Sequence, residues 1–231
     1  MRINIFSENI HKTLEVDEKK ALNAAKKILE FYLKEENIFN SSCFFGKDVN
    51  GISFDIFYCN NEKTHQINKE YRGKDYPADI ITFAVFADSE EKFILDGEIN
   101  LGEIIISLDK VAEKVKGKRE KVKGEAKCEV QSAKCKVQSA SCHCEEGQSP
   151  NAAIQKKGDG EIGNSELEIE SLHVSRLTSH VSPFEDELYF LISHGIMHLL
   201  GFDHQTNEDY TFIIKAQNAA LKSLEVQHEK L

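Results

Sequence analysis

The segment His194-Gly195-Ile196-Met197-His198-Leu199-Leu200-Gly201-Phe202-Asp203-His204 carries three histidines at spacing i, i+4 and i+10, with a glycine at i+7. On a helix, His194 and His198 lie on one face, because residues four apart are neighbours there. Gly201 supplies a left-handed turn of the kind that ends many helices, so that His204 can approach the same point. Three imidazoles that leave one coordination position open are typical of a catalytic zinc site. The segment therefore predicts one Zn²⁺ ion held by His194, His198 and His204.

The residues before this segment predict the helix independently. Ser182 is suited to the N-cap, Pro183 to the first helical position, and Glu185 follows the cap by three residues. Apolar residues then recur at helical spacing, namely Leu188, Leu191, Ile192, Ile196, Leu199 and Leu200. These signals predict a helix over 183–200, about five turns long. The alternative, three unrelated histidines, requires the caps, the glycine stop and the histidine spacing to coincide.

The residue after the first histidine limits the chemistry of this site. The spacing H-x-x-x-H-x-x-G-x-x-H is that of the metzincin proteases, in which a glutamate at this position is the general base for peptide hydrolysis. Gly195 stands there instead and cannot move a proton. A water bound to zinc can still ionise near neutral pH without that base. The pattern thus keeps the metal ligands and lacks the base of the peptidase.

The remaining sequence predicts alternating strands and helices around a small core. The expected strands are 2–6, 52–58, 79–86 and 102–107, and the expected helices are 17–36, 61–71, 108–116, 183–200 and 207–226. Such an order indicates an α+β fold with α/β-type layers, in which helices cover a small mixed sheet and one of them is a metzincin-like metal helix. We expect residues 1–231 to form a single domain.

Residues 117–180 interrupt this order. Three related heptads begin at Ala126, Ala133 and Ala140, and the surrounding composition is rich in Lys, Glu, Ser, Gln and Gly. Such a composition buries too little apolar surface to offset its chain entropy. We therefore expect a long, low-complexity, disordered insert. A second metal site is the alternative, with the ligands Cys128, Cys135, Cys142, His143 and Cys144, although their spacing matches no familiar zinc pattern.

The composition is that of a globular protein, with 40% hydrophobic and 29% charged residues. No apolar run reaches the roughly 18 residues of a membrane span, and the N-terminus lacks the apolar core of a signal peptide. These features predict a cytoplasmic protein that does not bind membranes. The formal charge of −10 argues against a nucleic-acid partner, but phosphate binding needs only a local basic patch. Residues 110–136 hold ten Lys or Arg and four Glu.

Three blocks together resemble the YbeY family of endoribonucleases, which are bacterial rRNA maturation factors. The histidine segment is similar to the family pattern H-G-x-x-H-L-L-G-[FY]-D-H. Residues 67–75, INKEYRGKD, with 79–83, DIITF, and residues 101–107, LGEIIIS, are similar to two further family blocks. The resemblance covers about 1–117 and 181–227. The chain departs from the family at two positions. Ala78 stands in place of the usual threonine, and Ala84 stands where a proline commonly follows the Ser-Phe pair of the family pattern.

The resemblance implies a metal-dependent endoribonuclease that uses zinc, is specific for single-stranded RNA, and acts in maturation of the small-subunit rRNA 3′ end and in ribosome quality control. Its partners would be single-stranded RNA, rRNA and the ribosome or its small subunit. Arg72 and His194 become the catalytic candidates, with Arg72 contacting phosphate, since a guanidinium forms a bidentate fork. From the residues alone, Arg72 could equally form a surface ion pair with Asp75 or Asp79. Asp203 could orient a ligand, contact the loop or carry a proton.

Two other functions fit parts of the sequence. One is a metal-dependent hydrolase of another bond, such as a peptide, which the missing glutamate disfavours. The other is a non-catalytic ribosome assembly factor with a structural zinc ion, which an open coordination position disfavours. The histidine pattern alone indicates a metal hydrolase, and the RNA substrate comes from the resemblance.

Overall fold

The computed structural model describes residues 1–86, 94, 96–120 and 181–226. Its elements follow in the order β1 (Arg2–Asn9), α1 (Glu18–Lys34), α2 (Glu36–Phe39), β2 (Gly51–Cys59), α3 (Asn61–Arg72), β3 (Ile80–Ala84), β4 (Glu98–Ser107), α6 (Pro183–Leu199) and α7 (Asn207–Val226). Residues 108–120 are also helical. The labelled elements belong to one compact unit, formed by Met1–Val115 and His173–Leu231. Of the expected insert, residues 121–180 lie outside the described part of the chain.

The four strands form one mixed sheet in the order β1-β2-β4-β3. β1 pairs in parallel with β2, and β2 pairs in parallel with β4. β3 runs antiparallel to β4, with Ile81 opposite Ile105. The edge strand β1 alternates between exposed and half-buried residues, whereas most residues of the central strand β2 are buried. The expected small mixed sheet is therefore confirmed.

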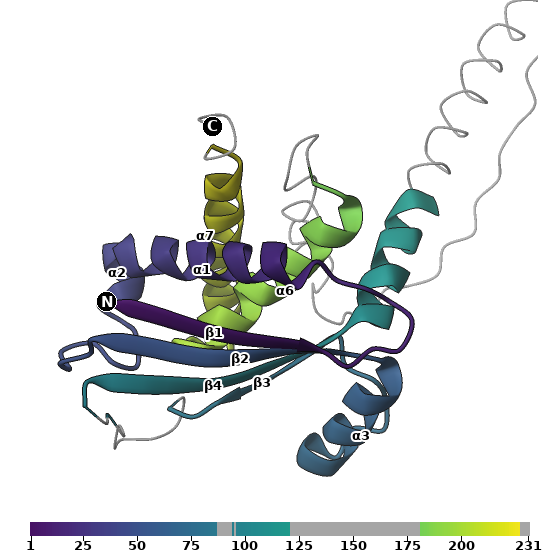
Figure 1. Ribbon diagram of the computed structural model, residues 1–231, viewed down its shortest axis with the longest axis horizontal. Coiled ribbons are helices and arrows are strands. Elements are labelled where there is room, and N and C mark those ends of the chain that lie inside the picture. The colour runs from purple at the N-terminus through teal and green to yellow at the C-terminus, as the bar shows by residue number, and fades with distance from the viewer. Residues whose placement is uncertain (87–93, 95, 121–180, 227–231) are drawn as a thin grey trace, which may run out of the picture. The chain divides into compact units, whose positions relative to one another are not determined.

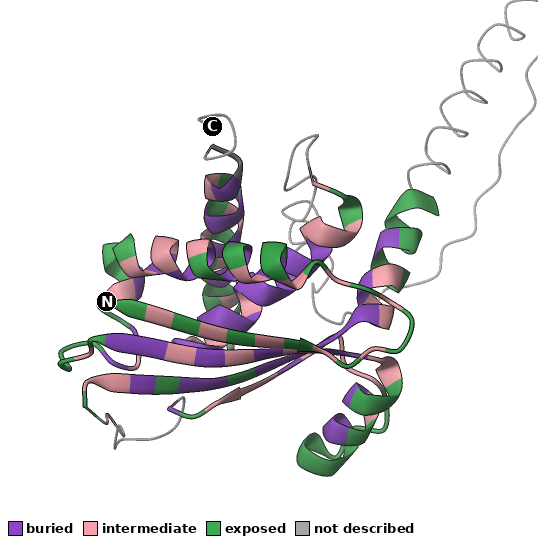
Figure 2. Ribbon diagram, viewed as in Figure 1, coloured by how far each residue is buried: buried purple, intermediate pink, exposed green. Residues whose placement is uncertain are grey.

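Helices cover both faces of this sheet (Figure 1). α1, α6 and α7 pack on one face over the main core, to which β2 and β4 contribute alternate side chains such as Ile56 and Ile104. α3 packs on the opposite face over a smaller cluster that contains Ile67 and Ile105. The buried side of α6 faces the sheet (Figure 2). The α+β class with helices on a small sheet is thereby confirmed.

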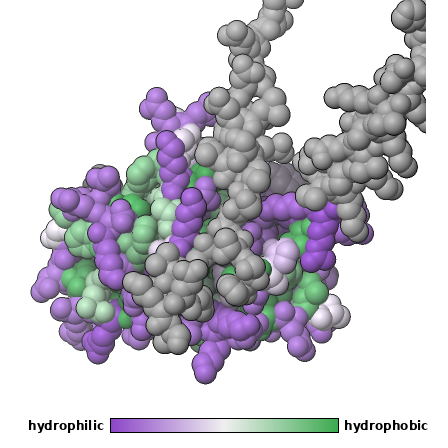
Figure 3. All heavy atoms as spheres, turned by 90° about the horizontal axis from the view of Figure 1, so that it is seen from above, coloured by the Kyte–Doolittle hydropathy of each residue, from purple (hydrophilic) through white to green (hydrophobic). Residues whose placement is uncertain are grey.

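Most element boundaries lie within two residues of the sequence predictions. α1 begins after Asp17, whose side chain accepts a hydrogen bond from the backbone nitrogen of Lys20. β1 extends three residues beyond the predicted end, and β4 begins four residues before the predicted start, at Glu98. Hydrophilic side chains occupy much of the described surface seen from above, with smaller hydrophobic areas between them (Figure 3). Among the described helices, none combines the length and apolar character needed to cross a membrane.

Candidate metal centre

The helix that carries the first two histidines begins and ends as its sequence predicts. The Ser182 hydroxyl accepts a hydrogen bond from the backbone nitrogen of Glu185 at 3.2 Å, and the Glu185 carboxylate accepts one from the backbone nitrogen of Ser182 at 3.0 Å. This is a complete capping box, with Pro183 in the first turn. Gly201 has φ +96°, a conformation that favours glycine. α6 therefore stops where the chain must reverse to bring His204 back.

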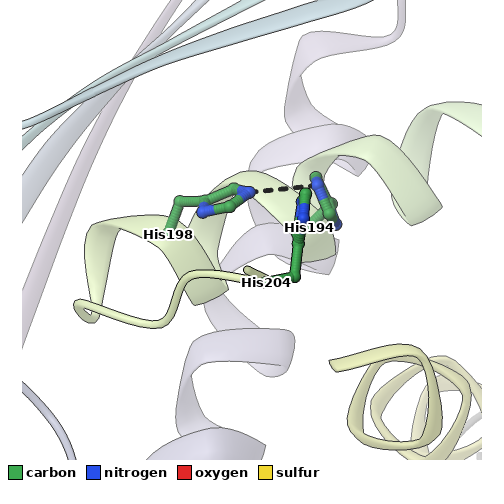
Figure 4. A group of neighbouring side chains, drawn as sticks. All are labelled: His194, His198 and His204. Carbon is green, nitrogen blue, oxygen red and sulfur yellow. Dashed lines mark hydrogen bonds between the residues drawn. The ribbon is translucent and has the colours of Figure 1, made fainter. Parts of the chain in front are cut away.

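The three histidines form one cluster (Figure 4). One ligand atom from each of His194, His198 and His204 can be chosen so that all three lie within 4.8 Å of one another. Nε2 of His198 is 3.1 Å from Nε2 of His194. The ring of His204 lies 5.4 Å from the ring of His194 and 5.2 Å from that of His198, centroid to centroid. Three imidazole nitrogens that converge in this way match the donor set of a catalytic zinc site.

Hydrogen bonds to Nδ1 orient the two helical histidines. The backbone oxygen of Phe202 accepts from Nδ1 of His198 at 2.8 Å. The side-chain oxygen of Gln217, on α7, lies 3.5 Å from Nδ1 of His194. Because both partners are acceptors, Nδ1 carries the proton in each ring and the Nε2 lone pair is left for a metal. Bonds of this kind commonly fix metal-binding histidines.

The electrostatics keep these imidazoles neutral. Burial, followed by the nearby His198 and His204, lowers the pKa of His194 to about 4. Burial and then His204 lower the pKa of His198 as well. A metal ligand must be deprotonated, and both rings satisfy this condition at neutral pH.

Close packing explains the glycine that follows the first histidine. A Cβ atom at Gly195 would lie 2.8 Å from two side-chain carbons of Ile104, which is fully buried in β4. A side chain at position 195 would therefore require Ile104 or α6 to shift. A glutamate base at the metzincin position would require the same shift.

Arg72 is the last residue of α3, and Gly73 ends that helix in the left-handed conformation with φ +65°. The two carboxylates considered as its partners bind other cations. Asp75 contacts Lys69 and His65 at 3.0 and 2.8 Å. Asp79 contacts Lys114 at 2.6 Å. The ion pair between Arg72 and either aspartate is therefore not formed, and the Arg72 side chain is exposed.

Arg72 also acts electrostatically on the histidine cluster. Burial and His204 are the larger causes of the lowered pKa of His198, and the positive charge of Arg72 adds to them. The structure thus places the guanidinium within electrostatic range of a predicted metal ligand. It lies on a different element from the histidines, 122 positions before His194 in the sequence.

Asp203 contacts the loop, which is one of the three roles considered for it. Its carboxylate accepts a 2.8 Å hydrogen bond from the backbone nitrogen of His204 and a 3.3 Å bond from Gln205. Backbone and side-chain donors, first of all that of His204, lower the pKa of Asp203. The contact shapes the turn that carries the third histidine.

Two polar residues take positions that the sequence pattern does not predict. His11 belongs to no motif in the sequence, but its side chain is only 6% exposed and lies 3.1 Å from Asp109. Gln217 was missed as a partner of His194, although it is fully buried. The available signal was a polar residue within an apolar stripe of α7 that includes Ile213, Ile214, Ala220 and Leu221. The sequence does not show that Gln217 contacts His194, because this contact depends on how α7 packs on α6.

A mixed sheet beneath a helix-borne cluster of three histidines defines an α+β protein with a site suited to a catalytic metal ion. The chain belongs to the family described as Endoribonuclease YbeY, whose sequence model matches residues 6–130 and 163–225. The unmatched residues 131–162 fall within the expected insert and are fewer than the 117–180 predicted for it.

Individual relatives agree with this family. The chain is 29% identical over 187 residues to a Bacillus licheniformis protein named Endoribonuclease YbeY, covering 80% of this chain and 73% of that protein. It is 27% identical over 233 residues to a protein of the same name from Acetivibrio thermocellus, and the match covers 97% of this chain and 99% of that protein. A third protein of this name, from Malacoplasma penetrans, is 26% identical over 204 residues. The match covers 88% of this chain and 85% of that protein.

Proposed function

We propose that this protein is a zinc-dependent endoribonuclease that cleaves single-stranded RNA in the cytoplasm. Its physiological role would be maturation of the small-subunit rRNA 3′ end and ribosome quality control, with rRNA and the small ribosomal subunit as partners. The convergence of His194, His198 and His204 within 4.8 Å is the observation that carries the proposal. Membership in the endoribonuclease family supports RNA as the substrate.

The three imidazoles would hold the metal through nitrogens that face the centre of the cluster. When bound, zinc in such a site supplies Lewis acidity that activates water or polarises a phosphate oxygen. His198 keeps its Nε2 directed inward because its Nδ1 is bound to the Phe202 backbone oxygen. His194 is oriented in the same way through Gln217. Both rings stay neutral at pH 7 and ready to bind.

Arg72 would bind the phosphate at the cleaved bond. Its guanidinium has no carboxylate partner among the described residues, so its donors remain available for phosphate oxygens. Negative charge grows on those oxygens as the phosphate becomes five-coordinate, and a fixed cation stabilises that charge. We propose Arg72 and His194 as catalytic residues, the first through phosphate and the second as a metal ligand.

Peptide hydrolysis is the competing activity of a three-histidine site. The glutamate base of the metzincins is absent, and Gly195 packs so closely against Ile104 that a side chain there would force Ile104 or α6 to shift. RNA cleavage is therefore favoured over peptide cleavage. A ribosome assembly factor with a purely structural zinc ion would not need an arginine that acts electrostatically on the cluster and has no carboxylate partner in the described part of the chain.

The deciding experiment compares wild-type protein with His198→Ala, purified in parallel, on a labelled single-stranded RNA and on casein. Metal content is measured on the same samples. We expect stoichiometric zinc and RNA cleavage in the wild type, with both lost in His198→Ala and no casein cleavage in either. Stoichiometric zinc in His198→Ala would remove this residue from the ligand set. Equal RNA cleavage in both samples would indicate a contaminating ribonuclease.

We also propose that residues 1–231 form one catalytic domain into which 117–180 are inserted. The family model passes over residues 131–162, which supports a dispensable segment there. Deletion of 120–178 should leave zinc content and RNA cleavage intact. Loss of the folded state on deletion would contradict the insertion.

A further inference from the structure

Arg72 and Asp79 line the same small pocket, and yet they form no ion pair with each other. The pocket has a volume of about 280 Å³ and is lined by residues from the end of α3, the start of β3 and the helical residues 108–120. Among the described residues of this lining, Asp79 is the one that is acidic. Arginine and a carboxylate readily form a strong bidentate pair. Something must therefore keep these two groups apart.

The electrostatic effects of the two groups also place them close to the same centre. The charge of Asp79 acts on His194, and the charge of Arg72 acts on His198. Nε2 of His194 and Nε2 of His198 are 3.1 Å apart. The Arg72 side chain is exposed at the end of α3, and an arginine stem is long and flexible enough to cross a pocket of this size. Asp79 is thus a carboxylate that Arg72 can approach.

Lys114 occupies the Asp79 carboxylate instead. Its Nζ lies 2.6 Å from Oδ2 of Asp79, and the other oxygen, Oδ1, accepts a 3.1 Å hydrogen bond from the backbone nitrogen of Ile80. Burial alone would raise the pKa of the Asp79 carboxyl, but the charge and the hydrogen bond of Lys114 hold that pKa below its ordinary value. The carboxylate is ionised at neutral pH, and Lys114 supplies its compensating charge.

A carboxylate of α6 holds Lys114 in turn. Oε1 of Glu187 lies 3.5 Å from Nζ of Lys114, and the Glu187 side chain is 3% exposed. Burial opposes the charge of Lys114, but Asp79 and Glu187 more than compensate and raise the pKa of the lysine. Lys114 is therefore a fixed cation that contacts β3 and α6 at once. It can bind Asp79 without giving up Glu187.

Asp75, the other carboxylate close to Arg72 in the sequence, lies in a different environment. Its side chain is 68% exposed and contacts both Lys69 and His65. It is not part of the pocket lining. Ion pairs between exposed groups contribute little to stability, so Asp75 competes weakly for a guanidinium. The half-buried Asp79 is the stronger competitor, because its charge is screened less by water and salt.

We propose that Lys114 is a positioning residue of the catalytic site, which binds Asp79 and thereby keeps the Arg72 guanidinium available for the phosphate of the RNA. Without Lys114, Asp79 would draw Arg72 into an internal pair, and the RNA would have to displace that carboxylate. The inference rests on the proposed function for the role of Arg72. It goes further in assigning a role to Lys114 and Asp79.

The test reads the state of Arg72 separately from the rate of RNA cleavage. The full-length protein is treated with phenylglyoxal, an arginine-selective reagent, and mass spectrometry follows the modification of each arginine over time. In parallel, kcat/KM is measured for cleavage of a labelled single-stranded RNA by metal-loaded protein. The variants are Lys114→Met, Asp79→Asn, Lys114→Met/Asp79→Asn and Lys114→Arg.

The chain offers two matched controls. Lys20 also bridges two carboxylates, Asp17 at 3.7 Å and Glu185 of α6 at 3.6 Å, but these residues lie outside the pocket lining. Lys20→Met therefore removes a comparable lysine without freeing a competitor of the catalytic arginine. Within each sample, Arg2, which is paired with Glu98, gives the modification rate of an exposed arginine in an ion pair.

We expect Arg72 of the wild type to react faster than Arg2. In Lys114→Met, the modification of Arg72 should slow to about the rate of Arg2, and kcat/KM should fall about tenfold, because a hydrogen bond between charged groups holds its partner by such a factor or more. Adding Asp79→Asn removes the competing carboxylate and should restore both values. Lys114→Arg keeps the cation and should retain both, and Lys20→Met should change neither.

Recovery in Lys114→Met/Asp79→Asn separates the proposed role from a structural one. Lys114→Met also removes a cation from beside the buried Glu187, and this loss is present in the single and the double variant alike. A rate that recovers in the double variant cannot be explained by the loss at Glu187. If Lys114→Met does not fold, Lys114→Met/Glu187→Gln removes both members of that pair and carries the same expectations.

An unchanged modification rate of Arg72 in folded Lys114→Met would overturn the proposal. A loss of cleavage that Asp79→Asn does not restore, or an equal loss in Lys20→Met, would do so as well. Protection of Arg72 in Lys114→Met, together with a wild type that does not cleave RNA, would contradict the proposed function and leave the control of Arg72 by Lys114 standing. RNA cleavage that is indifferent to Lys114→Met would do the reverse.

Discussion

The side-chain oxygen of Gln217 on α7 lies 3.5 Å from Nδ1 of His194 on α6, while the amide nitrogen of Gln217 donates a 3.2 Å hydrogen bond to the backbone oxygen of Phe190. The second bond fixes which end of the amide faces the histidine. Gln217 thereby determines the tautomer of His194, and α7 takes part in the site without contributing a ligand. Gln217 is a positioning residue, since it acts through His194.

Gln217→Leu should lower metal affinity about 10- to 100-fold, the usual cost of losing a partner that orients a ligand. Gln217→Glu retains an acceptor of similar shape and should lose less. Metal affinity is measured by competition with a chelating dye, and thermal unfolding of the metal-free variants reports any general loss of stability. Gln66→Leu, on an exposed position of α3, is the control. Unchanged affinity in a folded Gln217→Leu protein would show that His194 needs no such support.

Arg72→Ala should retain stoichiometric zinc and lose RNA cleavage by about 10²–10³-fold in kcat, since one electrostatic contact to the transition state has that value. Arg72→Lys keeps the charge without the bidentate fork and should recover part of the rate. Lys69→Ala removes another cation from the last turn of α3, one that pairs with Asp75 at the surface, and should leave the rate unchanged. Full activity in metal-replete Arg72→Ala would exclude Arg72 from the mechanism.

The features that the sequence could predict are those that depend on local rules. The capping box at Ser182, the pairing of His194 with His198 on one helical face and the turn at Gly201 all follow from nearby residues. The position of Gln217 depends on the packing of two helices, which periodicity cannot give. The burial of His11 against Asp109 likewise joins residues 98 apart.

The metal-free protein should lose stability as the pH falls from about 6.5 to about 4. Burial, then His198 and His204, lowers the pKa of His194 from 6.5 to about 4. In that interval the unfolded chain binds a proton at this residue and the folded chain does not, so protonation favours unfolding. The contribution is present above pH 6.5 and amounts to at most about 3 kcal/mol, at 1.36 kcal/mol for each pKa unit.

Urea unfolding of the chelator-treated protein at several pH values between 4 and 7 measures this dependence. His194→Gln has no titrating side chain at this position, so its free energy of unfolding should change less over the same interval. Parallel curves for the wild type and His194→Gln would show that other groups account for the acid sensitivity.

Gly195→Ala should destabilise the protein even though alanine is the better helix former. The added methyl group would meet two carbons of Ile104 at 2.8 Å and a third at 3.0 Å. Overpacking of this kind costs about 1–3 kcal/mol, against a gain of about 1 kcal/mol in helix propensity. The net loss of up to about 2 kcal/mol is measured by urea unfolding of the metal-free protein.

Ile104→Ala provides the matched background, because it removes the three atoms that the new methyl group would meet. In that background Gly195→Ala fills vacated space and should be neutral or stabilising. A destabilisation of the same size in both backgrounds would mean that contact with Ile104 does not require glycine at position 195. The absence of a glutamate base would then have to follow from the chemistry of the site and not from the packing of α6 on the sheet.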